Sequence, residues 1–326
     1  MSQVAELRLR MYLTLFLVFA IGFAIFFVLL GLLGVSSIGI VIFALLFFLI
    51  QWYVSPAILS RVSSLQYIKK NEYPKLHEMV EKLAKQAGVP VPKIAISPSK
   101  DPNAFVFGRT RRSATLVVHK GMLDIATDDE LYAVLAHEIG HLKHNDVVVM
   151  TFVSFIPMLA YLVAMTFLWG GMLDGNRNGG AYAALIGISA FFVYFVSELL
   201  MLALSRTRES FADSYSAQAT QKPEDLASAL AKITYRLASS KPTGNSVARS
   251  FYIADNFTAK KDVSMMEKYL QEIKKAFPNL DFSAFKSGVA NEASNPFSFF
   301  GAMFMTHPPT YKRILMLARM KNEETK

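Results

Sequence analysis

The stretch from Tyr132 to Asp146, "YAVLAHEIGHLKHND", carries three of the six histidines of this chain within eight positions. His137 and His141 are four residues apart, so on a helix they lie on one face and can bind a single metal ion. Glu138 lies about 100° around the same helix, where it can reach a water molecule at the metal and act as a general base. This H-E-x-x-H pattern therefore predicts two zinc ligands and a catalytic carboxylate.

The remaining histidines near this motif are not expected to bind the same ion. His144 continues the face of His137, but a helical rise of about 10 Å separates the two, which is too far for shared zinc ligation. We interpret His144 as an interfacial residue. His77 and His119 have no motif around them, and we interpret both as surface residues or as buried histidines with ordinary hydrogen bonds.

A catalytic zinc site keeps one open position and therefore needs a third protein ligand. Asp174, in "LDG", resembles the third-ligand motif of intramembrane site-2-type proteases. It follows about 40 Å of apolar helix, however, and we expect it on the opposite side of a membrane. The alternative is "SRTRESFADSYSA" at 205–217, where Glu209 and Asp213 are four residues apart. One of these carboxylates can bind the metal while the other orients a ligating imidazole.

Composition narrows the class of protein. The chain of 326 residues is 53% hydrophobic and has no cysteine. This hydrophobicity indicates a membrane protein. The absence of cysteine excludes disulfides and thiolate metal sites, so histidines and carboxylates must hold any metal. The net charge of +9 comes from basic residues that are dispersed and flank apolar runs. That distribution is typical of anchoring beside a membrane, and we expect no nucleic-acid partner.

Four apolar runs are long enough to cross a bilayer as helices; they are 11–33, 38–54, 147–173 and 181–205. The first exceeds the core of a signal peptide and is interpreted as an uncleaved anchor. A short turn makes the first two a hairpin, and a glycine-rich turn joins the last two. The alternative for the last two is that they are core helices of a large soluble domain. Glu198, inside the fourth run, is interpreted as snorkelling or paired with Arg206.

The positive residues predict the orientation of the first hairpin. Arg8 and Arg10 precede the first run, and Arg61, Lys69 and Lys70 follow the second, whereas the turn between the runs carries no charge. Both ends of the hairpin are therefore expected in the cytoplasm. If the second pair of runs is also a hairpin, the polar segments on either side of it lie on that same side and form one interrupted domain.

The polar segments contain helices and a small sheet. Thr127 and Glu130 form a capping box that starts the histidine helix. Short strands are predicted at 92–97 and 115–119, with an edge strand at 103–108 between them. Amphipathic helices are predicted at 72–87, 222–239, 263–277 and 308–322, and loops at 241–262 and 287–305. We interpret the Phe-rich 296–305 as packing, with a lid or membrane contact as the alternative.

The motifs "AHEIGHLKHND", "SRTRESFADSYSA" and "THPPTYKRI", together with the apolar segments, resemble the HtpX-type membrane zinc peptidases. These are gluzincins, a group that includes the CaaX prenyl proteases. The resemblance covers most of the chain and is weakest at 218–300. It implies one zinc ion per chain, bound by His137, His141 and Glu209. It also implies that Glu138 is the catalytic base and that Asp213 orients a ligand.

The resemblance carries two further expectations. "NAFVFG" is similar to the active-site edge strand of the family, which implies that Asn103, Ala104 and Phe105 bind the substrate backbone by strand addition. His307 and Arg313 match a C-terminal motif that approaches the site. A cation or imidazole there would stabilise the developing oxyanion, so we expect both residues to be catalytic.

The expected fold is a mainly α membrane protein, with transmembrane helices and a gluzincin-like zinc peptidase domain that contains a small β-sheet. The expected parts are a transmembrane hairpin, the first part of a cytoplasmic peptidase domain, a second apolar hairpin and the second part of that domain, at 1–54, 55–146, 147–204 and 205–326. The hypothesis is a multi-pass enzyme of the plasma membrane that faces the cytoplasm and cleaves misfolded or damaged membrane proteins. The alternatives are a CaaX-type processing protease and a non-catalytic zinc-binding adaptor.

Overall fold

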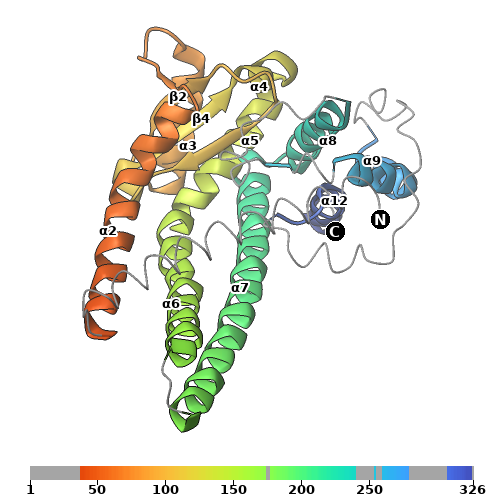
Figure 1. Cartoon of the computed structure of the whole chain (residues 1–326). Helices are drawn as coiled ribbons and strands as arrows, with labels where there is room; N and C mark the ends of the chain where they lie inside the picture. Colours follow the sequence, from red (N-terminus) through yellow and green to blue (C-terminus); the bar gives the residue numbers. More distant parts are fainter. Residues whose placement is uncertain (1–36, 174–176, 240–252, 255–258, 279–306, 325–326) are drawn as a thin grey trace. The chain divides into compact units, whose positions relative to one another are not determined.

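The structure is a computed structural model that describes residues 37–173, 177–239, 253–254, 259–278 and 307–324 (Figure 1). The chain forms two compact units. The first, called the apolar unit, consists of Met1–Tyr53 and Ser154–Glu198, and the second, called the mixed unit, consists of Val54–Val153 and Leu199–Lys326. The expected first apolar run at 11–33, Asp174 and the Phe-rich 296–305 lie outside the described residues.

The described part of the apolar unit consists of segments of three long helices, α2 (Ser37–Val62), α6 (Asp146–Leu173) and α7 (Arg177–Thr220). Phe48 of α2 contacts Phe155 of α6, with ring centroids 5.1 Å apart. Helices α6 and α7 approach closely at Gly187, where a Cβ atom would lie 2.6 Å from Cγ of Leu168. A glycine at such a crossing lets two apolar helices pack backbone to side chain.

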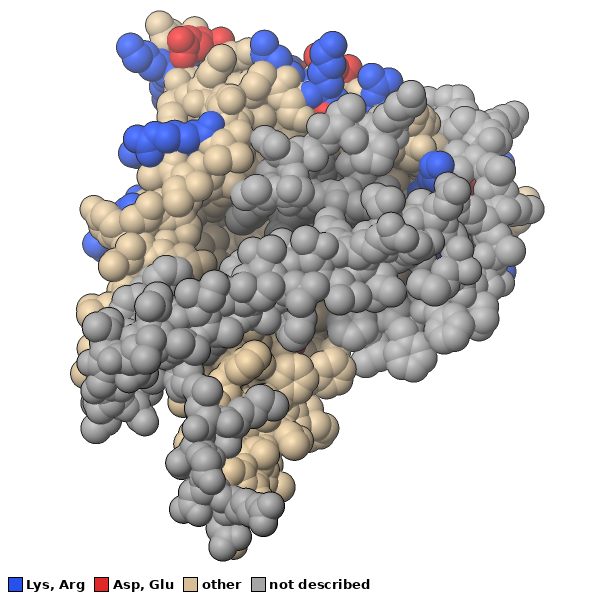
Figure 2. All heavy atoms as spheres, in the orientation of Figure 1, with Lys and Arg blue, Asp and Glu red and all other residues tan. Residues whose placement is uncertain are grey.

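Helices α6 and α7 are long and apolar enough to cross a membrane, over Asp146–Trp169 and Gly180–Thr220. They contain the runs expected at 147–173 and 181–205 (Figure 1). Core helices of a soluble protein bury most of their side chains, but only 17% and 11% of the residues in the most apolar windows of these helices are buried. In Figure 2 the visible surface of their lower part shows no charged side chain. These features favour a membrane environment over a soluble core.

The mixed unit contains a sheet whose described strands are β1 (Gln66–Tyr67), β2 (Lys93–Ser97), β3 (Ala104–Phe107) and β4 (Thr115–His119), in the order β1-β2-β4-β3. β2 and β4 are parallel, and β1 and β3 run antiparallel to their neighbours. β3 pairs with β4 through Ala104 opposite Val118 and Phe107 opposite Thr115. Within the described sheet, β3 is therefore an edge strand, as the sequence predicts.

The strands alternate between two faces, so each face is covered by a different set of helices. On one face, Ile94, Ile96, Leu116 and Val118 belong to the main core, which includes α3 (Pro74–Ala87) and α5 (Asp128–Lys143). On the other face, Phe105, Phe107 and Val117 pack with Leu59, near the end of α2. The sheet is thus enclosed on both sides, with α5 beneath the edge strand.

Helix α5 is central, and its ends are set by local sequence. The side chain of Thr127 accepts a hydrogen bond from the Glu130 amide, and Glu130 accepts one from the Thr127 amide, which confirms the predicted capping box. The helix ends at His144, and Asn145 has a φ of 60°, a left-handed conformation that Asn tolerates better than most residues. The turn before α6 therefore consists of only these two residues, and α6 begins at Asp146.

The remaining described helices are α4 (Lys120–Ile125), α8 (Pro223–Ser239), α9 (Ala259–Lys268), α10 (Leu270–Ala276) and α12 (Thr310–Glu324), together with the short helix η1 (Arg111–Ser113). α8 packs against α5, α9 and α12. Two expectations differ in detail. The helix expected at 263–277 is interrupted at Tyr269, and the loop expected at 241–262 ends earlier because α9 begins at Ala259.

Candidate metal centre

Helices α5 and α7 bring together three side chains that can hold a metal ion. They are His137 and His141, one turn apart on α5, and Glu209 on α7. The Nε2 atoms of the two imidazoles lie 3.2 Å apart. Oε2 of Glu209 lies 3.6 Å from Nε2 of His137, and Oε1 of the same carboxylate lies 3.5 Å from Nε2 of His141. The structure thus assembles the predicted ligand set from segments 68 residues or more apart in the sequence.

The spacing of these atoms suits zinc. Tetrahedral zinc with bonds of about 2.0–2.1 Å places its ligand atoms about 3.3–3.4 Å apart. The two imidazole nitrogens are 3.2 Å apart, and each lies 3.5–3.6 Å from one oxygen of the Glu209 carboxylate, which is close to that value. Oε2 of Glu209 is buried and accepts no hydrogen bond of ordinary length from the described residues; Nε2 of His137 and Nη1 of Arg313 lie 3.6 and 3.5 Å from it. A buried acceptor without a donor is costly unless a cation satisfies it, so the three residues fit a metal ion.

His137 is held from behind by a buried carboxylate. Its Nδ1 lies 2.9 Å from Oδ1 of Asp213, one turn beyond Glu209 on α7. Burial by itself lowers the pKa of His137, but the adjacent carboxylates of Asp213 and Glu209 raise it to about 9. Arg313 of α12 donates to both oxygens of Asp213, at 2.8 and 2.6 Å. Asp213 therefore orients the imidazole so that Nε2 faces the ligand group.

His141 is held in the same way by a residue that sequence reasoning missed. Its Nδ1 lies 2.6 Å from Oδ2 of Asp146, the first residue of α6. Arg208 donates to Oδ1 of Asp146 and to the carbonyl oxygen of His144. The available signals were an aspartate five residues after the second histidine and an arginine directly before Glu209. Neither signal follows the spacing of residues on one helix face. A turn separates His141 from Asp146, and Arg208 lies on another helix.

Glu138 lies beside the ligand group and is nearly inaccessible, with 3% of its surface exposed. Burial raises its pKa above the ordinary value for a glutamate, whereas the neighbouring imidazoles of His137 and His141 act in the opposite direction. A carboxylate with a raised pKa is better suited to accept a proton and return it than an ordinary solvated one. The predicted base is therefore close to the predicted metal.

His307 and Arg313 both approach the ligand group. Nδ1 of His307 lies 3.2 Å from Oε1 of Glu209, and Nη1 of Arg313 lies 3.5 Å from Oε2 of the same carboxylate. Arg313 is 2% exposed, and Nη1 also donates to the carbonyl of Ile253 at 2.8 Å. These contacts, together with those to Asp213, give Arg313 a part in holding the site. Its role in stabilising an oxyanion stays a prediction, as does that of His307.

Asn103, Ala104 and Phe105 lie at the start of the edge strand and are all buried. The side-chain oxygen of Asn103 accepts a hydrogen bond of 2.9 Å from the Ile253 amide. Because the Ile253 carbonyl is bound by Arg313, the backbone of this one residue connects the edge strand with the metal centre. The Phe105 side chain belongs to the cluster with Leu59, on the face of the sheet opposite the main core.

The other histidines discussed above lie outside the ligand group. His119 is buried, and its Nδ1 lies 3.0 Å from the Asp101 carbonyl, which agrees with a structural role. His144 packs against the rings of Phe211 and Tyr215 on α7.

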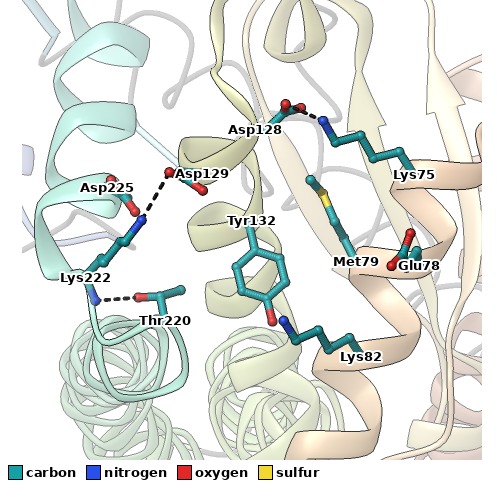
Figure 3. A pocket seen from close by; sticks show the side chains of 10 residues that line it. All are labelled: Lys75, Glu78, Met79, Lys82, Asp128, Asp129, Tyr132, Thr220, Lys222 and Asp225. Atoms are coloured by element: carbon teal, nitrogen blue, oxygen red, sulfur yellow. Dashed lines mark hydrogen bonds and ion pairs between the residues drawn. The ribbon is translucent and has the colours of Figure 1, made fainter.

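A surface cavity of about 410 Å³ lies between α3, the start of α5, the end of α7 and the start of α8 (Figure 3). Four of its charged side chains form two ion pairs, Lys75 with Asp128 and Lys222 with Asp129. Figure 3 shows these pairs across the cavity, with Tyr132 between them. The lining includes none of the metal-centre residues. This cavity is therefore not the site of the chemistry.

Comparison with known proteins finds relatives that are proteases, in agreement with a metal centre of this kind. The model of peptidase family M48 matches residues 70–321. A protease HtpX homolog of Methanothermobacter thermautotrophicus is 39% identical over 236 residues, covering 72% of this chain and 88% of that protein. A protease HtpX homolog of Pyrococcus furiosus is 34% identical over 284 residues, covering 85% of this chain and 83% of that protein.

A solved structure is also similar. The crystal structure of S. mikatae Ste24p superposes with a TM-score of 0.54 at 19% identity, covering 97% of this chain and 67% of that chain. This likeness concerns the fold and confirms the predicted class, mainly α with a small sheet in a peptidase domain. The relatives confirm the expected metallopeptidase activity and a metal requirement. The chain belongs to peptidase family M48.

Proposed function

We propose that the chain is a membrane-anchored zinc endopeptidase that binds one zinc ion through His137, His141 and Glu209. The observation that carries the proposal is the spacing of 3.2–3.6 Å between the three ligand groups. The buried Oε2 of Glu209, which accepts no hydrogen bond of ordinary length from the described residues, supports the same assignment. Three protein ligands leave a fourth position open for a substrate or water, as catalytic zinc sites require.

The proposed chemistry is hydrolysis of a peptide bond by water. Zinc, when bound, supplies a Lewis acid that polarises the scissile carbonyl and lowers the pKa of water. Glu138 accepts the proton of the attacking water and delivers it to the leaving amine, which its buried position and raised pKa favour. Asp213 and Arg313 keep His137 in place, and His307 and Arg313 lie where they can stabilise the developing negative charge.

The proposed substrate site is the outer edge of β3. The backbone of Asn103, Ala104 and Phe105 would pair with an extended segment of substrate, as an edge strand can. In support, β3 has a partner on one side only within the described sheet, and Asn103 is connected through Ile253 with Arg313 at the metal centre.

The proposed substrates are misfolded or damaged membrane proteins, and the proposed place is the plasma membrane with the site facing the cytoplasm. Support comes from the exposed apolar surface of α6 and α7 and from the basic residues that flank the apolar runs. The peptidase domain would comprise 55–146 and 205–326, with apolar hairpins at 1–54 and 147–204. Cleavage of a lipidated C-terminal peptide in preference to an unmodified one would favour a CaaX-type processing role instead.

The decisive experiment is the Glu138→Gln variant of the full chain in detergent. We expect stoichiometric zinc, an unchanged unfolding temperature and a loss of casein hydrolysis of about 10²-fold or more, because the proton acceptor is removed. Asp129→Asn, an exposed substitution on the same helix, is the control and should keep full activity. Full activity of Glu138→Gln would refute the mechanism, and zinc that persists after combined loss of His141 and Glu209 would refute the ligand assignment.

A further inference from the structure

Both metal-site histidines are backed by an Asp–Arg pair, but the two pairs come from different parts of the fold. Behind His137, Asp213 and Arg313 belong to α7 and α12. Behind His141, Asp146 and Arg208 belong to the first turn of α6 and to α7. The second pair therefore involves α6 and α7, each of which is apolar and long enough to cross a membrane.

Arg208, on α7, connects that helix with two others. It binds the Asp146 carboxylate on α6 and the His144 carbonyl at the end of α5, while its own backbone belongs to α7. A guanidinium at the end of a helix suits the carbonyl groups that have no partner in the helix. Glu209 follows Arg208 directly on α7. A movement of Arg208 would thus act on His141, through Asp146, and would accompany a movement of Glu209.

The position of Asp146 is tightly constrained. Only His144 and Asn145 separate it from the end of α5, so its carboxylate must stay close to the last turn of that helix, where His141 lies. Asp146 is 6% exposed. A buried carboxylate bound to both an imidazole and a guanidinium fixes the direction of the ring.

We propose that Asp146 and Arg208 are positioning residues for His141, and that they make metal affinity depend on how α6 and α7 are held together where both helices enter the mixed unit. This inference rests on the proposed role of His141 as a zinc ligand. The pair does not reach substrate. It acts through the imidazole. A shift of α6 at Asp146 or of α7 at Arg208 would weaken zinc binding before the domain unfolds.

The test measures zinc affinity by competition with a chromophoric chelator, on the full chain in detergent. Asp146→Asn should weaken zinc binding by about 10- to 100-fold, the usual effect of losing a carboxylate behind a ligating histidine. Arg208→Gln should act in the same direction by a smaller factor, and Arg208→Lys should lie between Arg208→Gln and the natural protein. The double variant should bind zinc no more weakly than Asp146→Asn alone, because Arg208 acts through Asp146.

Glu130→Gln is the matched control. Glu130 is 5% exposed, belongs to the same helix α5 as His141 and is paired with Lys232 at 2.8 Å, but lies at the opposite end of that helix. It should lower the unfolding temperature in chelator without changing zinc affinity. With cobalt in place of zinc, the visible absorption bands should change in Asp146→Asn and remain unchanged in Glu130→Gln, because only the former reorients a ligand.

The outcomes separate this inference from the proposed function. Equal zinc affinity in Asp146→Asn and the natural protein, or an equal loss in Glu130→Gln, would overturn the positioning role. If Asp146→Asn fails to fold, the zinc affinities of Arg208→Gln and Arg208→Lys test the positioning role instead. Zinc affinity equal to that of the natural protein in both variants would overturn it. Zinc that remains bound after His141→Ala would instead overturn the ligand assignment on which the inference rests.

Discussion

At the scale of single residues, spacing within one helix carries the most information. His137 with His141, and Glu209 with Asp213, are each four residues apart. The structure places each pair on one helix, and the two helices meet at the candidate metal centre. Asp146 and Arg208 were not predictable in this way, because their contacts depend on a two-residue turn and on the approach of a second helix. The resemblance to a family suggested that Arg313 approaches the site, but not that it pairs with Asp213, which lies 100 residues away in the sequence.

The first prediction concerns protons at the metal centre. With its pKa raised to about 9, His137 in the metal-free protein is protonated at pH 7, and a metal must displace that proton. Below this pKa, each unit of pH increase should strengthen zinc binding about tenfold, and the gain should end as the pH passes the pKa. Calorimetry in two buffers of different ionisation enthalpy should show release of about one proton from this group at pH 7. Zinc affinity that is independent of pH between 6 and 8 would contradict the prediction.

At the scale of elements, the metal centre depends on how closely α7 approaches α5. Gly140, inside the H-E-x-x-H motif, faces α7, and a Cβ atom there would lie 3.2 Å from Cα of Ala212 and 3.2 Å from Cδ1 of Tyr215. These distances are shorter than ordinary van der Waals contact. Gly140 thus allows the close packing that brings Glu209 to the two histidines. The sequence indicates both helices, but not the distance between them.

The second prediction is therefore that Gly140→Ala weakens zinc binding by several-fold, because α7 must move by a few tenths of an ångström. The gain in helix propensity, about 1 kcal/mol, should offset part of the loss in stability, so zinc affinity is the more sensitive measurement. Gly88→Ala is the control. Gly88 has a φ of 69°, and a Cβ atom added there would lie more than 4 Å from its described neighbours, so this change should lower stability and leave zinc affinity unchanged.

The third prediction concerns the start of α5. Burial by itself raises the pKa of Glu130, but hydrogen bonds from Lys232, Ser228 and the Thr127 amide bring it below the ordinary value. A carboxylate whose pKa is lowered in the folded state stabilises the protein above its ordinary pKa of about 4.5, and this contribution is lost as the pH falls through the lowered value. Glu130→Gln should therefore cost about 1–2 kcal/mol in the free energy of unfolding at pH 7.

Denaturant unfolding at pH 7 and near pH 4 measures this effect. The difference between the natural protein and Glu130→Gln should begin to shrink near pH 4, because Glu130 is then protonated in part of the unfolded chains while it is still charged in the folded protein. A difference that stays constant over this range would show that the charge of Glu130 has no part in holding the start of the helix.

At the scale of the whole molecule, the order of the apolar runs and polar segments could be predicted from the sequence, because length and hydropathy are local properties. The strand order β1-β2-β4-β3 could not, since it depends on which strands meet in space. Neither could the way that α6 and α7 continue from the apolar unit into the mixed unit without a break. Because of that continuity, the orienting carboxylate Asp146 and the ligand Glu209 belong to the same helices, α6 and α7, that are candidates for crossing the membrane.

The fourth prediction tests orientation in the membrane. Because the chain has no cysteine, a single introduced cysteine reports on one place only. Lys85→Cys, on the exposed side of α3 in the mixed unit, should react with an impermeant maleimide only from the cytoplasmic side of vesicles. Tyr182→Cys, 71% exposed near the start of α7, should react only from the opposite side, since α7 would cross the bilayer between Tyr182 and Glu209. Labelling of both cysteines from the same side would show that α6 and α7 do not span the membrane. The side of the membrane that the zinc site faces could then not be inferred from these helices.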